Sequence, residues 1–145
     1  MGLWRRLVER IRERDLKSLV GPMHSSDRLT RADACSKLGK HKDTRGVSIL
    51  IATIQDKSED GEIRYSAAVG LGLSANARAL EPLLAALNDS NGYVRQGAVA
   101  GLHCLGDPRA IAPLRALHDR DEDVQKAVQY SLRKLERNAG EIRRR

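Results

Sequence analysis

The chain has 145 residues, of which 41% are hydrophobic and 31% are charged, a composition that suits one folded domain and excludes a disordered tail. It contains no run of about 18 apolar residues, so a transmembrane span is excluded. With one Trp, three Tyr and no Phe, the core must be built from Leu, Ala, Val and Ile, which favours packed helices over a β-sandwich.

The net charge of +7 is concentrated at the two ends of the sequence. Residues 1–24 carry a net charge of +3 and residues 133–145 a net charge of +4, which leaves residues 25–132 neutral. A nucleic-acid groove needs clustered positive charge on the folded body. A nucleic acid or an anionic membrane therefore stays open as a partner only through the basic ends and is not favoured.

Residues 1–24 are predicted to form a basic amphipathic segment. Its first part places Trp4, Leu7, Val8 and Ile11 on one helical stripe, with arginines elsewhere. Three interpretations stay open: a cap over the apolar end of a repeat array, a helix that docks on a membrane or partner, and a disordered leader. Its second part, with Leu16, Leu19, Val20 and Met23, indicates a degenerate outer helix of the first repeat.

The same start argues against export, because charged residues interrupt it before an apolar stretch of about seven residues can form. Cys35 and Cys104 are the only cysteines, too few for a secreted disulfide scaffold. We therefore expect a cytoplasmic protein.

The central sequence repeats itself. Residues 63–72 match residues 94–103 at an offset of 31, and the match continues from Asn76–Leu83 to Asp107–Leu114. An upstream copy begins near Arg31 at an offset of 33, and a downstream copy, from Val124 to Leu135, at an offset of 30. Within each copy apolar residues recur every three or four positions, and turn residues separate the runs, so each unit is predicted to be a pair of helices.

One helical pair cannot bury both of its apolar sides, so the pairs must stack. The motif running from Val94-Arg95 through Leu105-Gly106-Asp107-Pro108-Arg109 to Asp119 resembles the HEAT-like repeat family. It is similar to the short bacterial and archaeal form first associated with phycobilisome bilin lyases. The resemblance implies an all-α fold, a right-handed α-solenoid of about four helical pairs over residues 25–136, followed by a basic tail at 137–145.

The resemblance also implies two layers of helices. The convex layer is expected at about Arg45–Gln55, Ala79–Asn88 and Ala110–His118. The concave layer is expected at about Leu29–Gly39, Glu62–Leu73, Gly92–Leu105 and Glu122–Glu136.

Arg31, Arg64 and Arg95 form a ladder at one position of the concave helices, where the last unit has Gln125. Two interpretations follow. The arginines could bind an acidic or phosphate-bearing partner, or they could pair with the junction residues Asp56, Asp89 and Asp119, which share their period. We favour the second. Another ladder, Arg45, Arg78 and Arg109, follows the capping residues Asp43, Asn76 and Asp107 and is also expected to be structural.

The third, seventh and tenth residues of each concave helix are the ones least needed by the core. They are Ala32, Ser36 and Gly39; Tyr65, Val69 and Gly72; Gln96, Ala100 and His103; and Lys126, Tyr130 and Arg133. This pattern indicates either a solvated surface or one that binds a peptide or helix. The candidate binding residues are Arg31, Arg64, Tyr65, Arg95, Gln96, His103, Lys126 and Tyr130.

No catalytic or metal motif is present: histidines and cysteines lack ligand spacing, and neither a nucleophile elbow nor a phosphate loop occurs. Cys35 and Cys104 are expected to be buried and unbridged. We predict a non-enzymatic protein-interaction scaffold without a cofactor. The alternatives are an auxiliary or chaperone-like subunit of a bilin-lyase-type cofactor-attaching enzyme, and an adaptor that binds membrane or nucleic acid through its termini.

Overall fold

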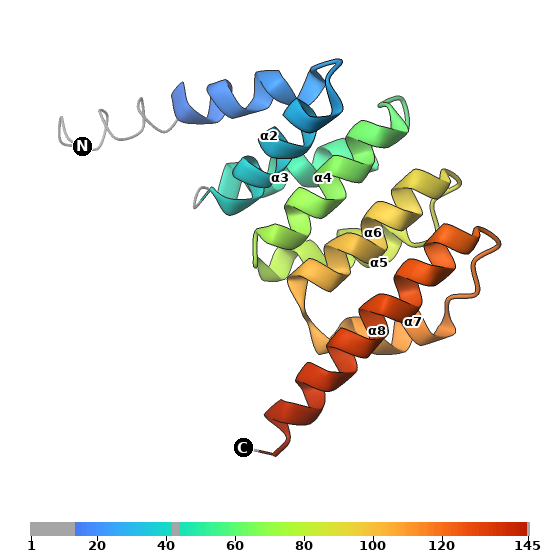
Figure 1. Cartoon of the computed structure of the whole chain (residues 1–145). Helices are drawn as coiled ribbons and strands as arrows, with labels where there is room; N and C mark the ends of the chain where they lie inside the picture. The colour runs from blue at the N-terminus through green and yellow to red at the C-terminus, as the bar shows by residue number, and fades with distance from the viewer. Residues whose placement is uncertain (1–13, 42–43, 145) are drawn as a thin grey trace.

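The helices of the computed structural model alternate between two layers (Figure 1). The structure describes residues 14–41 and 44–144. The inner layer consists of α2 (Arg28–Lys40), α4 (Gly61–Leu73), α6 (Gly92–Leu105) and α8 (Glu122–Ile142). The outer layer consists of α3 (Thr44–Gln55), α5 (Leu80–Ala86) and α7 (Ile111–Ala116). Because α2 packs on α4, α4 on α6 and α6 on α8, the predicted all-α solenoid is confirmed.

The first helical pair begins with the degenerate outer helix. Residues 14–20 are helical and lead into a 3-10 turn, η1 (Gly21–His24), that packs on α2. Leu16 and Met23 are buried there, as the apolar spacing predicts. The described residues thus contain four helical pairs, whereas Trp4 and the rest of residues 1–13 lie outside them.

Asp or Asn caps the start of every inner helix, where the first backbone N–H groups have no partner within the helix. Each cap accepts a hydrogen bond from a backbone N–H in the first turn; the caps are Asp27, Asp60, Asn91 and Asp121. The turns that lead to α5 and α7 repeat one geometry, since Ala75 and Gly106 have φ of 51° and 71°. These repeated caps and turns explain why the predicted helix boundaries are close to the observed ones.

The last inner helix is longer than expected. α8 continues past Glu136 to Ile142, into the segment for which the sequence suggested a tail. Figure 1 shows its C-terminal part projecting beyond the other helices. Among the described residues, no helix combines the length and apolar character that a membrane crossing needs.

Neighbouring inner helices approach each other through glycine. A Cβ atom at Gly39 would collide with the carbonyl oxygen of Gly70, and one at Gly72 with that of Gly101. Both glycines are buried, so placing them on an open concave surface was wrong. These positions hold glycine because the backbone of the next inner helix leaves no room for a side chain.

Candidate functional site

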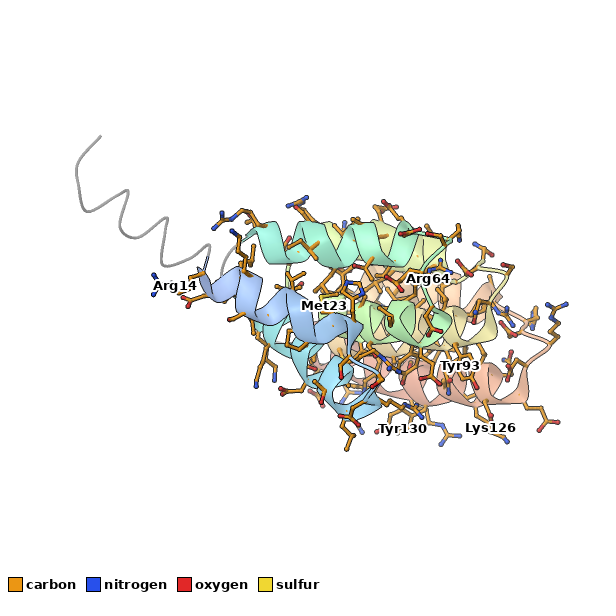
Figure 2. The ribbon with its side chains drawn as sticks, turned by 90° about the horizontal axis from the view of Figure 1, so that it is seen from above. Arg14, Met23, Arg64, Tyr93, Lys126 and Tyr130 are labelled. Atoms are coloured by element: carbon orange, nitrogen blue, oxygen red, sulfur yellow. The ribbon has the colours of Figure 1, made fainter. Side chains whose placement is uncertain are left out.

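The arginine ladder lies inside the protein. Arg31, Arg64 and Arg95 are 7%, 3% and 8% exposed, and Figure 2 shows Arg64 between the two helix layers. They were candidate binding residues, but the structure does not place them on the exposed concave surface. Their contacts support the structural interpretation instead.

Arg64 and Arg95 each form an ion pair with an aspartate in the loop after the next outer helix. For Arg64 this helix is α5, and for Arg95 it is α7. Arg64 Nη2 lies 2.5 Å from Asp89 Oδ2, and Arg95 Nε lies 2.6 Å from Asp119 Oδ2. Arg64 also donates to the backbone carbonyl of Ile54, at 2.9 Å from Nε and 2.7 Å from Nη2. Each guanidinium therefore ties its inner helix to outer-layer loops, which fixes the spacing of the units.

The electrostatics of Asp89 follow from this burial. Its side chain is 1% exposed, and burial alone would raise the pKa of the carboxyl group. Hydrogen bonds from Arg64 and Lys57 outweigh burial and hold the pKa of Asp89 well below its ordinary value. The hydrogen bond from Arg95 likewise lowers the pKa of Asp119. Both aspartates are ionised partners in their ion pairs at neutral pH.

The predicted pair of Arg31 with Asp56 does not form. Arg31 Nη2 instead lies 2.6 Å from Glu62 Oε2, and Nη1 donates to the carbonyl oxygens of Ser25 and Ser26. Asp56 Oδ1 accepts from the backbone N–H and the hydroxyl of Ser58. The chain between Asp56 and the start of α4 is two residues longer than the chain between Asp89 and the start of α6. Within this longer segment Asp56 bonds to Ser58, and Glu62 forms the ion pair with Arg31.

The capping residues of the second arginine ladder are found where the structure describes them. Asn76 and Asp107 cap the turns before α5 and α7 as predicted, whereas Asp43 lies outside the described residues.

The two cysteines differ in burial. Cys35 is buried and Cys104 is exposed, so the expectation of two buried cysteines was wrong for Cys104. Cys104 lies near the C-terminal end of α6, at a position that the packing of the described helices leaves exposed. Neither cysteine forms a disulfide.

All three tyrosines of the chain lie on inner helices and reach solvent. Tyr65 on α4 is half-buried, Tyr93 on α6 is 56% exposed, and Tyr130 on α8 is 67% exposed. Figure 2 shows Tyr93, Lys126 and Tyr130 along one side of the inner layer, away from the buried Arg64. We call Tyr65, Tyr93, Gln96, His103 and Tyr130 the tyrosine face.

The sequence pattern missed Tyr93. It is the second residue of α6, at the repeat position that carries Leu29 on α2 and Glu62 on α4. Leu29 is 79% exposed. Large apolar side chains at a solvent-facing position of two inner helices are the signal that would have revealed Tyr93.

His103 supports Tyr130. The two rings are stacked, with centroids 5.1 Å apart and an interplanar angle of 21°. Burial, and to a lesser degree the nearby Lys134, lowers the pKa of His103, so the imidazole is neutral at neutral pH. A neutral ring stacked on the phenol restricts the Tyr130 side chain. This restriction reduces the conformational entropy that a partner's binding would remove.

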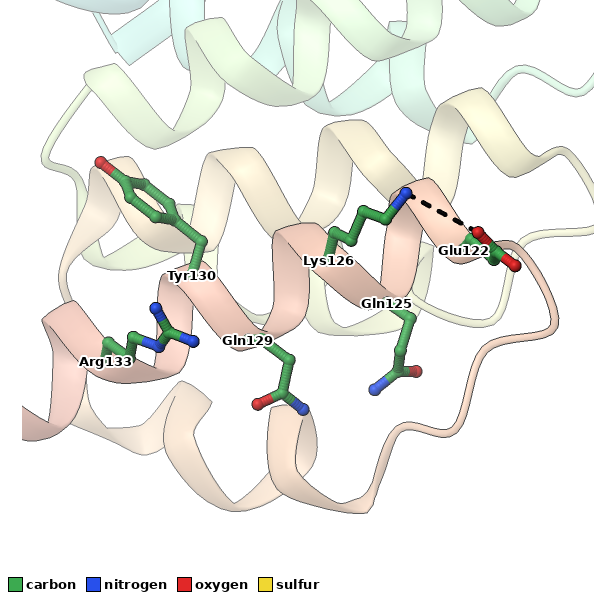
Figure 3. Close-up of a pocket in the computed structure, with 6 residues that line it drawn as sticks. All are labelled: Glu122, Gln125, Lys126, Gln129, Tyr130 and Arg133. Carbon is green, nitrogen blue, oxygen red and sulfur yellow. Dashed lines mark ion pairs between the residues drawn. The ribbon is translucent and has the colours of Figure 1, made fainter.

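Lys126 lies at the edge of the tyrosine face and lines an open groove on α8 with a volume of about 460 Å³. Glu122, Gln125, Gln129, Tyr130 and Arg133 complete its lining (Figure 3). The Lys126 ammonium lies 3.7 Å from a Glu122 carboxylate oxygen. Both side chains are largely exposed, so this pair holds Lys126 weakly.

Among residues 14–41 and 44–144, no group of three or more His, Cys, Asp or Glu side chains is placed to hold a metal ion. The chemistry that the tyrosine face offers is contact: phenol rings for apolar packing, hydroxyl and amide groups for hydrogen bonds. Aromatic residues of this kind dominate the energetics of many protein interfaces.

Comparisons with known proteins agree with this architecture. A family model described as HEAT repeats matches residues 56–133, more than half of the chain. No curated protein matches.

Two solved structures have a similar fold. One is the complex of CpcE and CpcF of phycocyanin lyase from Nostoc sp. PCC7120, with a TM-score of 0.55 and 25% identity over 81% of this chain. The other is an engineered protein, with a TM-score of 0.56 and 20% identity over 83% of this chain. The chain spans only 53% and 62% of the length of those two chains.

Proposed function

Because this chain belongs to the HEAT-repeat family, we propose that it is a non-enzymatic module that binds a protein partner on its concave tyrosine face. The observation that carries the proposal is the position of the tyrosines. A core built from Leu, Ala and Val has no need of them, and all three lie where a partner can reach them. The surface between them is lined by the small side chains of Val69 and Ala100, both half-buried, which leaves room for a partner's side chains.

The tyrosine face suits a protein segment better than a polyanion. Two of the inner helices, α4 and α8, have carboxylates in their first turn, Glu62 on α4 and Glu122 and Asp123 on α8, which stabilise the positive ends of these helix dipoles. Glu62 and Asp123 occupy on α4 and α8 the position that Tyr93 occupies on α6, and such carboxylates would repel a phosphate backbone. Free thiols at Cys35 and Cys104 support a reducing, cytoplasmic setting.

Replacing Tyr93 and Tyr130 by alanine tests the proposal. We expect the double variant to retain its unfolding midpoint, because both side chains are more than half exposed. We expect it to lose a protein that the wild type captures from extracts of the native cell, with affinity for that protein at least about tenfold weaker. Quantitative mass spectrometry of the captured proteins, followed by titration calorimetry, makes the measurement.

The matched control replaces Arg78 and Arg109, exposed residues before the outer helices, by alanine. It should capture the same protein as the wild type. Equal capture by the two double variants would contradict the assignment of binding to the tyrosine face.

A second candidate function rests on the structural likeness to the phycocyanin lyase complex, at 25% identity. In that case the chain is an auxiliary subunit of a bilin-lyase-type enzyme, and its protein partner is another subunit or the protein that receives the bilin. Mixing the chain with free phycocyanobilin and apo-phycocyanin should then accelerate covalent attachment, measured by bilin absorbance on denaturing gels. An unchanged attachment rate and an unchanged bilin spectrum would exclude a direct action of the chain on the bilin or on the protein that receives it.

A further inference from the structure

α8 presents a second surface beside the tyrosine face. Lys126, Arg133 and Arg137 are separated by seven and four residues, a spacing that places them on one side of a helix. All three are exposed. We call these three residues the basic face of α8.

The part of the chain that the structure describes pairs the cations of this face weakly or not at all. Within residues 14–41 and 44–144, neither Arg133 nor Arg137 has an ion-pair partner, and Lys126 has only two long contacts, at 3.7 and 3.8 Å. By contrast, the nearby Arg115 pairs with Glu136 at 2.7 Å. The basic face therefore offers charge to an external partner without first breaking strong internal pairs.

The neighbouring flank of α8 is built differently from the other junctions between units. The positions that meet the next inner helix hold Cys35 and Gly39 in α2, Ala68 and Gly72 in α4, and Val99 and His103 in α6; His103 is half-buried and the others are buried. In α8 the corresponding positions hold Gln129 and Arg133, and both are exposed and line the groove shown in Figure 3. Side chains of this size rule out the close backbone contact that Gly72 of α4 makes with Gly101 of α6.

We propose that the basic face of α8 binds an acidic α-helix of a partner protein. The three cations span about 16 Å along α8, at 1.5 Å per residue, and a helix packed nearly parallel to α8 presents carboxylates at matching intervals. Gln125 and Gln129 beside them can donate amide hydrogen bonds to that helix. A single row of three cations matches the carboxylate row of one helix in length and spacing.

The probe is an alanine-rich helical peptide with glutamates at positions i, i+4, i+7 and i+11. Its control has the same composition, with the glutamates scattered around the helix. We expect the full chain to bind the patterned peptide more tightly than the scattered one, by fluorescence anisotropy, with an affinity that falls as salt is added. R133E combined with R137E should weaken binding at least about tenfold.

The matched control is K17E combined with R28E, which makes the same change of charge at exposed residues of the opposite end of the array. It should leave binding of the patterned peptide within about twofold of the wild type. Equal losses in the two double variants, or equal binding of the two peptides, would overturn the proposal. Tighter binding of an oligothymidine or of phosphatidylserine vesicles than of the patterned peptide would overturn it as well.

The tyrosine face and the basic face of α8 fail independently. Loss of peptide binding in the R133E and R137E variant, with partner capture through Tyr93 unchanged, assigns two separate surfaces to the array.

Discussion

Replacing Leu102 by alanine lowers the free energy of unfolding by about 2–5 kcal/mol. Leu102 is fully buried on α6, the inner helix that packs on α4, α5 and α8. Removing its side chain therefore leaves a cavity where two units meet, in a core that cannot close around it without moving whole helices. Urea unfolding followed by circular dichroism at 222 nm measures the loss.

Gln96, on the same helix, provides the comparison. Its side chain lies on the half-exposed tyrosine face, and its replacement by alanine should cost less than about 0.5 kcal/mol. Equal stability losses for the Leu102 and Gln96 variants would show that the assignment of the two faces of α6 is wrong.

Replacing Asp89 by asparagine should destabilise the protein by about 3–5 kcal/mol, because it leaves the Arg64 guanidinium buried without its counter-charge. The two side chains are 1% and 4% exposed, so water cannot replace the lost carboxylate. Asparagine can still accept the hydrogen bond that Asp89 receives from the Asn91 backbone N–H. The substitution therefore removes the negative charge while keeping this hydrogen bond. Chemical unfolding at neutral pH measures the resulting change in the free energy of unfolding.

Asp107 offers a matched control, since it also caps a turn and pairs with an arginine. The Arg109 side chain is 65% exposed, so Asp107→Asn should cost less than about 1 kcal/mol. If both aspartate variants lost the same stability, the buried pair would not fix the junction between units.

The Asp89 contribution should also depend on pH. Its pKa in the folded protein is below the ordinary value, so its stabilisation is complete above the unfolded pKa of about 3.9 and is lost as the pH falls below that value. The difference in unfolding free energy between wild type and Asp89→Asn should therefore narrow between pH 7 and pH 3. A constant difference would contradict the ionised pair.

The repeat offsets predicted the helices well because the residues that begin and end each helix recur in every unit. Asp or Asn starts each inner helix, and the apolar spacing continues to the turn, so boundaries such as Gly92–Leu105 follow from local sequence. The burial of the arginine ladder could be expected from the matching period of Asp89 and Asp119. The partner of Arg31 could not be predicted, because the two extra residues between Asp56 and α4 accompany a local hydrogen bond of Asp56 with Ser58, and Glu62 reaches the guanidinium instead.

The faces of the helices were harder to predict. Gly39 and Gly72 were placed on an open surface because small residues are common there as well as at close helix contacts. Only the distance between neighbouring backbones separates the two cases, and single-helix periodicity does not contain it. Tyr93 was missed because only two of the four helices, with Leu29 and Tyr93, have a large apolar residue at this repeat position, whereas Glu62 and Asp123 make the other two acidic.

Photocross-linking in the native cell tests the central claim, that the tyrosine face binds a protein, most directly. Benzoylphenylalanine replaces Tyr93 in one version of the chain and Arg78, an exposed residue before the outer helix α5, in another. Irradiation should join a single protein to the chain through position 93 and should leave position 78 without that adduct. The same adduct from position 78, with none from position 93, would contradict the account.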